Sequence, residues 1–150
     1  MKKLLLLVAL FVGVVSSSSA QSFDSSSRYV GLSVGLFSGI GAPISITYEQ
    51  AVTDDIGVGA LLGWSSYREN SVGYTNVLLG ARGNYHFLDN AKFDVYAGLI
   101  LAYNAASYSS GGLIFGGQVG GRYLFNDRFA AVAEIGYGLG LITLGATYSF

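Results

Sequence analysis

The residues of this chain best suited to chemistry are six ionisable side chains in its central and C-terminal parts. They are Glu49, Arg82, His86, Asp94, Arg122 and Glu134. A histidine beside carboxylates can move protons near neutral pH or bind a metal ion. The same set can instead form ion pairs, because an isolated buried charge is costly. Spacing and the elements that carry these residues decide between the two interpretations.

An enzymatic or metal site is the weaker interpretation. His86 is the only histidine, and there is no cysteine. We find no serine and carboxylate that complete a triad pattern with it, and no group with the spacing of metal ligands. Asp54 and Asp55 lie in a turn. We therefore predict no catalytic, cofactor-binding or metal-binding residue, and a protein that is not an enzyme.

The N-terminus has the features of a secretory signal peptide. Lys2 and Lys3 precede an apolar run over 4–15, and small residues follow it up to Ala20. The run is too short for a transmembrane helix. We predict cleavage after Ala20 and three regions: a signal peptide over 1–20, a short periplasmic segment over 21–28, and one domain over 29–150.

The composition disfavours nucleic acid as a partner and points to a membrane. Only 11% of the residues are charged, whereas 51% are hydrophobic. Without Lys2 and Lys3, six basic and nine acidic residues remain, so no basic patch is available to neutralise phosphates. An exported apolar chain that has no run long enough for a spanning helix can cross a bilayer as a closed β-barrel.

The elements that carry the six ionisable residues are segments in which apolar and polar residues alternate. In the segment 44–51, for example, Ile44 and Tyr48 share one face, while Ser45 and Glu49 share the other. This period of two is typical of β-strands. We predict eight strands, at 29–38, 44–51, 56–67, 75–87, 93–104, 114–125, 129–138 and 141–150.

Three further features favour a barrel over a soluble secreted β-protein, which alternation alone leaves open. Tight polar turns alternate with longer Gly/Ser-rich connectors, and the turns lie at 53–55, 88–92 and 126–128. Aromatic residues gather on the apolar face near both ends of the segments. The other face is mostly small, which suits a narrow lumen. The link 138–140 has to be a tight loop, and Gly83, Gly117 and Gly121 on the apolar face predict bends or bulges.

The last predicted strand carries a specific pattern. It has a threonine, a glycine two residues later and two aromatic residues at alternating positions: Thr143, Gly145, Tyr148 and Phe150. This pattern resembles the C-terminal β-signal that outer-membrane barrels present to their assembly machinery. With the strand–turn–strand units over 48–54 and 122–131, it makes the region 29–150 similar to the small eight-stranded outer-membrane barrels, the OmpA/OmpX-like and opacity-porin-like family.

The resemblance implies a fold, a location and partners. The expected fold is an all-β, antiparallel, up-and-down transmembrane barrel in a Gram-negative outer membrane. Its expected partners are lipid and, through the last strand, the barrel assembly machinery; we expect a monomer. The family includes adhesins, structural barrels, narrow pores and a few lipid-modifying enzymes. Those enzymes place their histidine near the outer side, whereas His86 lies near a tight turn.

The six ionisable residues all fall on the predicted inward face. Arg82 and Glu134 lie about seven residues from a turn, and the other four lie nearer the tight turns. We predict an ion-pair network, with Gln118 nearby, that plugs the lumen of a structural or surface-interaction barrel. The alternative is a narrow pore for ions or very small solutes, gated when the ion pairs exchange partners. Two outer loops, 68–70 and 108–110, are weaker candidates for a partner-binding surface.

Overall fold

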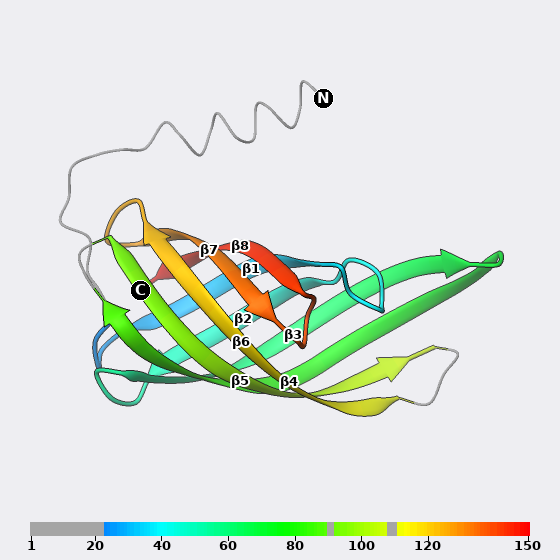
Figure 1. Cartoon of the computed structure of the whole chain (residues 1–150), viewed down its shortest axis with the longest axis horizontal. Helices are drawn as coiled ribbons and strands as arrows, with labels where there is room; N and C mark the ends of the chain where they lie inside the picture. Colours follow the sequence, from blue (N-terminus) through cyan, green and yellow to red (C-terminus); the bar gives the residue numbers. More distant parts are fainter. Residues whose placement is uncertain (1–22, 90–91, 108–110) are drawn as a thin grey trace, which may run out of the picture.

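A single closed sheet makes up the fold of this chain. The structure, a computed structural model, describes residues 23–89, 92–107 and 111–150. Eight antiparallel strands follow one another around the barrel in sequence order, and the last pairs with the first (Figure 1). The prediction of an all-β, eight-stranded up-and-down barrel is confirmed. The predicted signal peptide and its cleavage site lie outside the described residues.

The strands agree closely with the predicted segments. They are β1 (Arg28–Leu36), β2 (Ile44–Ala51), β3 (Ile56–Glu69), β4 (Val72–Asp89), β5 (Phe93–Ala106), β6 (Gly112–Leu124), β7 (Phe129–Gly136) and β8 (Ile142–Ser149). β1 ends two residues before the predicted bound because Phe37 has a φ of 54°, which is not an extended conformation. Within the described residues, no helix is long and apolar enough to cross a membrane.

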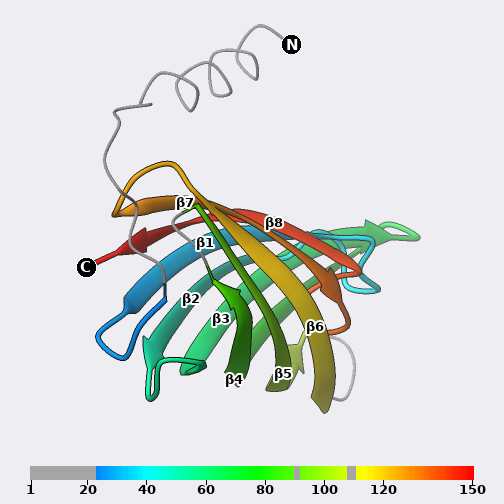
Figure 2. The ribbon, with the colours of Figure 1, turned by 60° about the vertical axis from the view of Figure 1, so that its left-hand side comes forward.

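The outer surface of the barrel is apolar and the lumen is filled. Because side chains alternate along a strand, each strand presents large apolar residues outward and buries the intervening ones. Leu32, Leu79 and Leu99, for example, are about 60% exposed, whereas their inward neighbours pack in the lumen. A soluble β-protein would bury such residues, so the outward apolar face rules out that alternative. Figure 2 shows the strands side by side around the barrel.

The two ends of the barrel differ. The connections after β2, β4 and β6 lie with the start of β1 at one end, which we call the tight-turn end. At the other, the hairpin end, the β3–β4 hairpin projects furthest (Figure 1). It continues to the pair Glu69↔Val72, beyond the last β2–β3 pair, Ile44↔Trp64. Tight turning is possible at Asn70 and Ser71 because their φ angles are 47° and 66°.

Two local expectations have different outcomes. The β7–β8 link is tight, as predicted: the Gly136 N–H donates to the Leu141 carbonyl at 3.0 Å. Gly83, Gly117 and Gly121, which led us to expect bends or bulges, all pair in register. The register shift in β4 falls instead between His86 and Leu88. Phe87 and Leu88 both face outward there, 54% and 51% exposed.

Candidate functional site in the barrel lumen

The lumen is built from inward side chains that all eight strands and the β7–β8 link place at successive depths. From the hairpin end, the inward residues of β4 follow in the order Asn76, Leu78, Gly80, Arg82, Asn84 and His86. Glycines on neighbouring strands leave room for the large side chains. A Cβ on Gly120, for example, would lie 2.9 Å from the Tyr96 ring. The small inward residues therefore make space for a few large polar ones.

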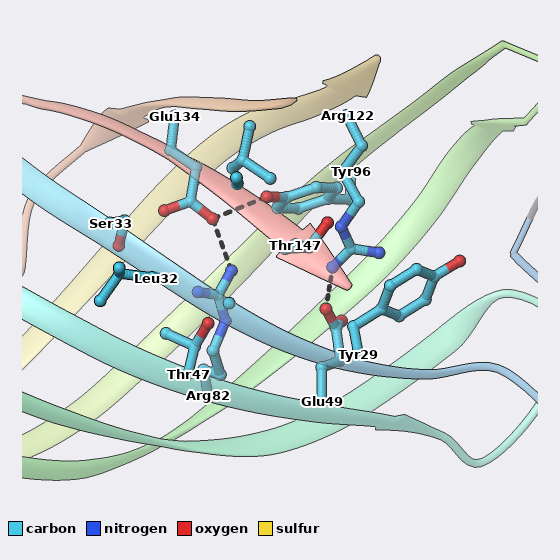
Figure 3. Close-up of a pocket in the computed structure, with 13 residues that line it drawn as sticks. Tyr29, Leu32, Ser33, Thr47, Glu49, Arg82, Tyr96, Arg122, Glu134 and Thr147 are labelled. Carbon is cyan, nitrogen blue, oxygen red and sulfur yellow. Dashed lines mark hydrogen bonds and ion pairs between the residues drawn. The ribbon is translucent and has the colours of Figure 1, made fainter. Parts of the chain in front are cut away.

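An ion pair between β4 and β7 spans the middle of the lumen. Arg82 Nη2 lies 2.6 Å from Glu134 Oε1, and both side chains are 5% exposed. The Tyr96 hydroxyl donates to the same carboxylate oxygen at 2.7 Å. Figure 3 shows both interactions. A buried pair with an additional hydrogen bond meets the condition under which a charge is tolerated away from water.

A second group of charges, which we call the lower network, lies nearer the tight-turn end. It consists of Glu49, His86, Asp94 and Arg122. Arg122 pairs through Nη2 with Glu49 and through Nη1 with Asp94, the latter at 2.9 Å. Asn84 donates to Glu49 at 2.7 Å, and Gln118 donates in turn to Asn84 at 3.2 Å.

His86 bridges the two carboxylates of the lower network. Its Nδ1 lies 2.6 Å from Asp94 Oδ1, and its Nε2 lies 3.2 Å from Glu49 Oε1. A neutral imidazole donates from one nitrogen only, and a carboxylate only accepts. Both contacts are hydrogen bonds when the ring carries two protons. In that form the three cations of the lumen balance its three carboxylates, Glu134 included.

Aromatic rings enclose the lower network, and sequence reasoning missed this. The Arg122 guanidinium lies 4.2 Å from the ring centre of Tyr29 and 4.9 Å from that of Tyr96. Phe23, assigned only to a short segment before the barrel, is 3% exposed. Its ring stacks on His86 with centroids 3.6 Å apart and planes 8° apart. Phe23 therefore covers the network at the tight-turn end.

An apolar cluster, which we call the apolar plug, fills the lumen toward the hairpin end. Its members are at most 3% exposed: Leu61, Leu78, Ile100, Ala102 and Leu139. Alternation of apolar and polar residues does not predict this cluster, because its members are apolar at inward positions. The available signal was three consecutive apolar residues in each of two neighbouring strands, 60–62 and 77–79, which meet at the pair Leu62↔Leu79. Leu139 comes from the tight β7–β8 link.

The remaining predicted residues lie elsewhere. Thr143 of the assembly pattern is buried in the lumen wall, whereas Tyr148 faces outward between Phe129 and Phe150. Residues 68–70 form the tip of the β3–β4 hairpin, and 108–110 lie outside the described residues. Over 23–89, 92–107 and 111–150, no group of three His, Asp or Glu side chains is arranged to hold a metal ion. The absence of catalytic and cofactor-binding residues stays a prediction.

Comparison with known proteins identifies the fold. No protein-family model matches the chain, and no curated protein matches it in sequence. Among solved structures, it is similar to the N-terminal β-barrel domain of Pseudomonas aeruginosa OprF, with 19% identity and a TM-score of 0.62 over 87% of this chain and 100% of that one. A de novo designed transmembrane β-barrel matches with 14% identity and a TM-score of 0.61 over 87% and 100%.

A third match is a barrel whose structure was determined in lipid. The Yersinia pestis outer-membrane protein Ail, in a phospholipid bilayer nanodisc, has 15% identity and a TM-score of 0.55 over 87% of this chain and 99% of that one. All three matches span nearly the whole described barrel. The chain thus has the fold of the small eight-stranded transmembrane β-barrels.

Proposed function

We propose that this chain is an integral barrel of the bacterial outer membrane, with a structural or surface-interaction role and a lumen that conducts no solute. The outward apolar face supports the membrane location, since it would be fully wetted in a soluble protein. Outward-facing aromatic side chains at both ends of the barrel also support the membrane location. Phe93, Phe129 and Phe150 lie at the tight-turn end, and Trp64 and Tyr137 toward the hairpin end. Such belts suit the two membrane interfaces.

The apolar plug carries the proposal of a closed lumen. Along β4, Leu78 lies on the hairpin side of Arg82, and along β5, Ile100 lies on the hairpin side of Tyr96. Any solute has to pass the plug as well as the ion pairs. Breaking or exchanging ion pairs leaves this apolar barrier in place, and a charged solute in a dry apolar constriction pays a large desolvation cost.

One observation favours the alternative of a gated pore. Arg82, Glu134, Glu49 and Arg122 line the same small cavity, so the two arginines lie close to each other's partners (Figure 3). An exchange of partners is therefore a short movement. For conduction, however, the same event would also have to displace the side chains of the plug.

The proposed partners follow from the surface. Lipid covers the apolar face, and the last strand, with Tyr148 and Phe150, binds the assembly machinery. The projecting β3–β4 hairpin, with Arg68, Glu69 and Asn70 at its tip, is the element placed to contact a partner outside the membrane. A monomer suits a closed barrel, whose strands leave no unpaired edge along the spanning part.

Planar-bilayer conductance of the refolded barrel tests the closed lumen. A heat-modifiability gel first confirms folding of each sample. We expect wild type, Arg82→Ala and Leu78→Ala to be silent, and the double variant Arg82→Ala/Leu78→Ala to show discrete steps because both barriers are weakened. Leu79→Ala, which truncates an outward leucine, is the matched control in the Arg82→Ala background. Channel steps in wild type that Arg82→Ala alters would instead establish the gated pore.

A further inference from the structure

A small cavity lies between the two groups of charges in the lumen. Its volume is about 20 Å³. Its polar lining includes Arg82 and Glu134 from one group, Glu49 and Arg122 from the other, and Thr147 of β8. Figure 3 shows these side chains converging from opposite walls of the barrel. The lining of the cavity therefore contains several charged and hydroxyl groups, in contrast to the apolar plug.

Three buried polar atoms of this lining have no hydrogen-bond partner among the described residues. They are Arg82 Nε, Arg122 Nε and Thr147 Oγ1. Two are N–H donors, and the third is a hydroxyl that both donates and accepts. Leaving such groups unsatisfied costs free energy, and buried polar groups in folded proteins are rarely left so. Three at one cavity indicate a missing partner that accepts and donates hydrogen bonds.

We propose that this cavity binds one water molecule that joins the two groups of charges. One water needs roughly 10–15 Å³ of such volume, so the cavity fits one. Its oxygen accepts from the arginine N–H groups, and its hydrogens go to Thr147 Oγ1 and to a carboxylate oxygen. The inference rests on the lumen geometry alone and does not depend on the proposed function.

A neutral molecule fits the cavity better than an ion. Glu49 and Glu134 present carboxylates to the same space, so an anion would be repelled there. A cation would meet the guanidinium groups of Arg82 and Arg122. Each guanidinium already has its own carboxylate, so the cavity has no unbalanced charge to neutralise. A water molecule gives the three unpartnered atoms a hydrogen-bond partner without adding a charge.

The position of the cavity predicts slow exchange of this water. The apolar plug lies on its hairpin side, and Phe23 covers the lower network on the other side. The water therefore leaves only when one of these contacts opens. It should remain bound for much longer than a water on the protein surface.

Two measurements on the wild-type barrel test the site without any substitution. In a high-resolution crystal structure soaked in sodium bromide, we expect one water within hydrogen-bond distance of Thr147 Oγ1 and no anomalous bromide signal. In micelles, we expect NMR cross-peaks between water and Thr147 protons with the sign of a long-lived water. An empty cavity, a bromide peak or the absence of these cross-peaks would overturn the proposal.

A matched pair of variants, refolded in vitro, tests the role of the hydroxyl. Thr147→Val keeps the shape of the side chain and removes one water ligand, so the crystallographic water and its cross-peaks at residue 147 should be lost. Thr143→Val makes the same change at another inward position of β8 and should keep the water. Heat-modifiability gels confirm folding of both. Retention of the water in Thr147→Val with normal occupancy would show that the hydroxyl does not bind it, and would contradict the proposed site.

Discussion

Arg122 joins the two carboxylates of the lower network to the aromatic rings around them. It lies between the rings of Tyr29 and Tyr96 and pairs with Glu49 and Asp94. An arginine in this position satisfies two carboxylates at once through its planar fork, which a lysine cannot reproduce. The stability of the lower network therefore depends on this one side chain.

Arg122→Ala should lower the free energy of unfolding by about 3–5 kcal/mol, because two buried carboxylates lose their main partner. Urea unfolding in lipid vesicles measures this through the fluorescence of Trp64, the only tryptophan, which faces outward. Arg122→Lys should recover part of the loss. Arg128→Ala, at an exposed turn, is the control. An Arg122→Ala curve that superimposes on the Arg128→Ala curve would refute the central role of Arg122.

Two neighbouring glycines should respond in opposite ways to the same substitution. A Cβ on the inward Gly98 would lie 2.7 Å from the carbonyl oxygen of Gly83, whereas a Cβ on the outward Gly83 would meet nothing closer than 3.9 Å. Gly98→Ala should cost about 1–3 kcal/mol through overpacking. Gly83→Ala should be neutral or stabilise by up to about 1 kcal/mol, since alanine loses less conformational freedom. The same unfolding assay measures both variants. Equal changes in unfolding free energy for Gly98→Ala and Gly83→Ala would contradict this prediction.

At the residue scale, the sequence predicts charges better than it predicts their surroundings. Depth counted from the turns separates Arg82 and Glu134 from the other four charges, and the ion pairs follow the same division. The stacking of Phe23 on His86 had no sequence signal, because it joins a residue outside the alternating segments to one inside the barrel. Which rings meet depends on how the chain folds back, and period-two patterns carry no information about that.

The N-terminal turn, residues 23–27, is an element in its own right. Asp24 accepts hydrogen bonds from the side chains of Ser26 and Ser27, at 2.8 and 2.9 Å, and the Ser27 N–H donates to the Asp24 carbonyl. The Ala51 N–H donates to the Ser27 carbonyl, which fixes the turn to the end of β2. The turn positions Phe23 over the lower network.

This turn should loosen in acid. The hydrogen bond from the Ser26 side chain lowers the pKa of Asp24 below its ordinary value. The charged form is therefore favoured by folding, and its contribution is complete above an unfolded pKa of about 4 and lost as the pH falls through the lower folded value. Amide hydrogen exchange of Ser26 and Ser27 should become faster, relative to exposed amides, in that window.

Asp24→Ala should abolish this pH dependence and leave the two amides in fast exchange at neutral pH. Asp127→Ala, in the exposed β6–β7 turn, is the matched control and should change neither amide. Slow exchange of Ser27 in Asp24→Ala would show that the backbone bonds alone hold the turn.

At the scale of elements, alternation predicted all eight strands but not all of their lengths. The added residues of β5 pair with β4, and those of β6 pair with β5. β3 and β4 run further than predicted because their hairpin continues beyond the barrel as a two-stranded ladder, past the last pairs with β2 and β5. There the side chains no longer face lipid and lumen in turn. The alternation of apolar and polar residues is therefore lost, although the hydrogen bonds between the strands continue. Leu61 and Leu78 show the converse, since inward apolar residues interrupt the pattern without interrupting the strands.

The stability of the whole barrel should not depend on the outer part of the β3–β4 hairpin. Beyond Trp64, β3 has no pairing with β2. Replacing residues 68–73 with Asn-Gly would close the hairpin directly after the stacked pair Tyr67 and Tyr74 through a favourable type I′ turn. We expect heat-modifiability to be unchanged and the unfolding free energy to move by less than about 0.5 kcal/mol.

The same variant separates folding from surface interaction. If the hairpin is the partner-binding element, adhesion of cells that display the shortened barrel should fall while the amount of folded protein in the membrane stays constant. Loss of folded protein would instead make the hairpin part of the structural unit. A control that replaces Arg68 and Glu69 with serine keeps the hairpin length and tests the charges alone.

At the scale of the molecule, the closed barrel was predictable because no other arrangement suits these segments. An apolar outer face on every strand and a small inner face fit one sheet closed on itself, whereas a sandwich would need a second sheet to cover the outer face. How the lumen is sealed was predictable only in part. The charged residues could be predicted because they interrupt an inward face made mostly of small residues. The apolar plug could not, because its residues do not differ in type from the many apolar residues that face outward.

The pairing of β1 with β8 determines the order in which the barrel can form. Seven of its eight ladders join strands adjacent in sequence, but Tyr29 pairs with Ser149 at the opposite end of the chain. Closing a loop of that length costs about 4 kcal/mol in chain entropy, so we expect this seam to form last. Until then the sheet has two unpaired edges with an apolar face. A helper that holds β8 during insertion would protect one edge from pairing with another copy, leaving β1 to complete the cylinder.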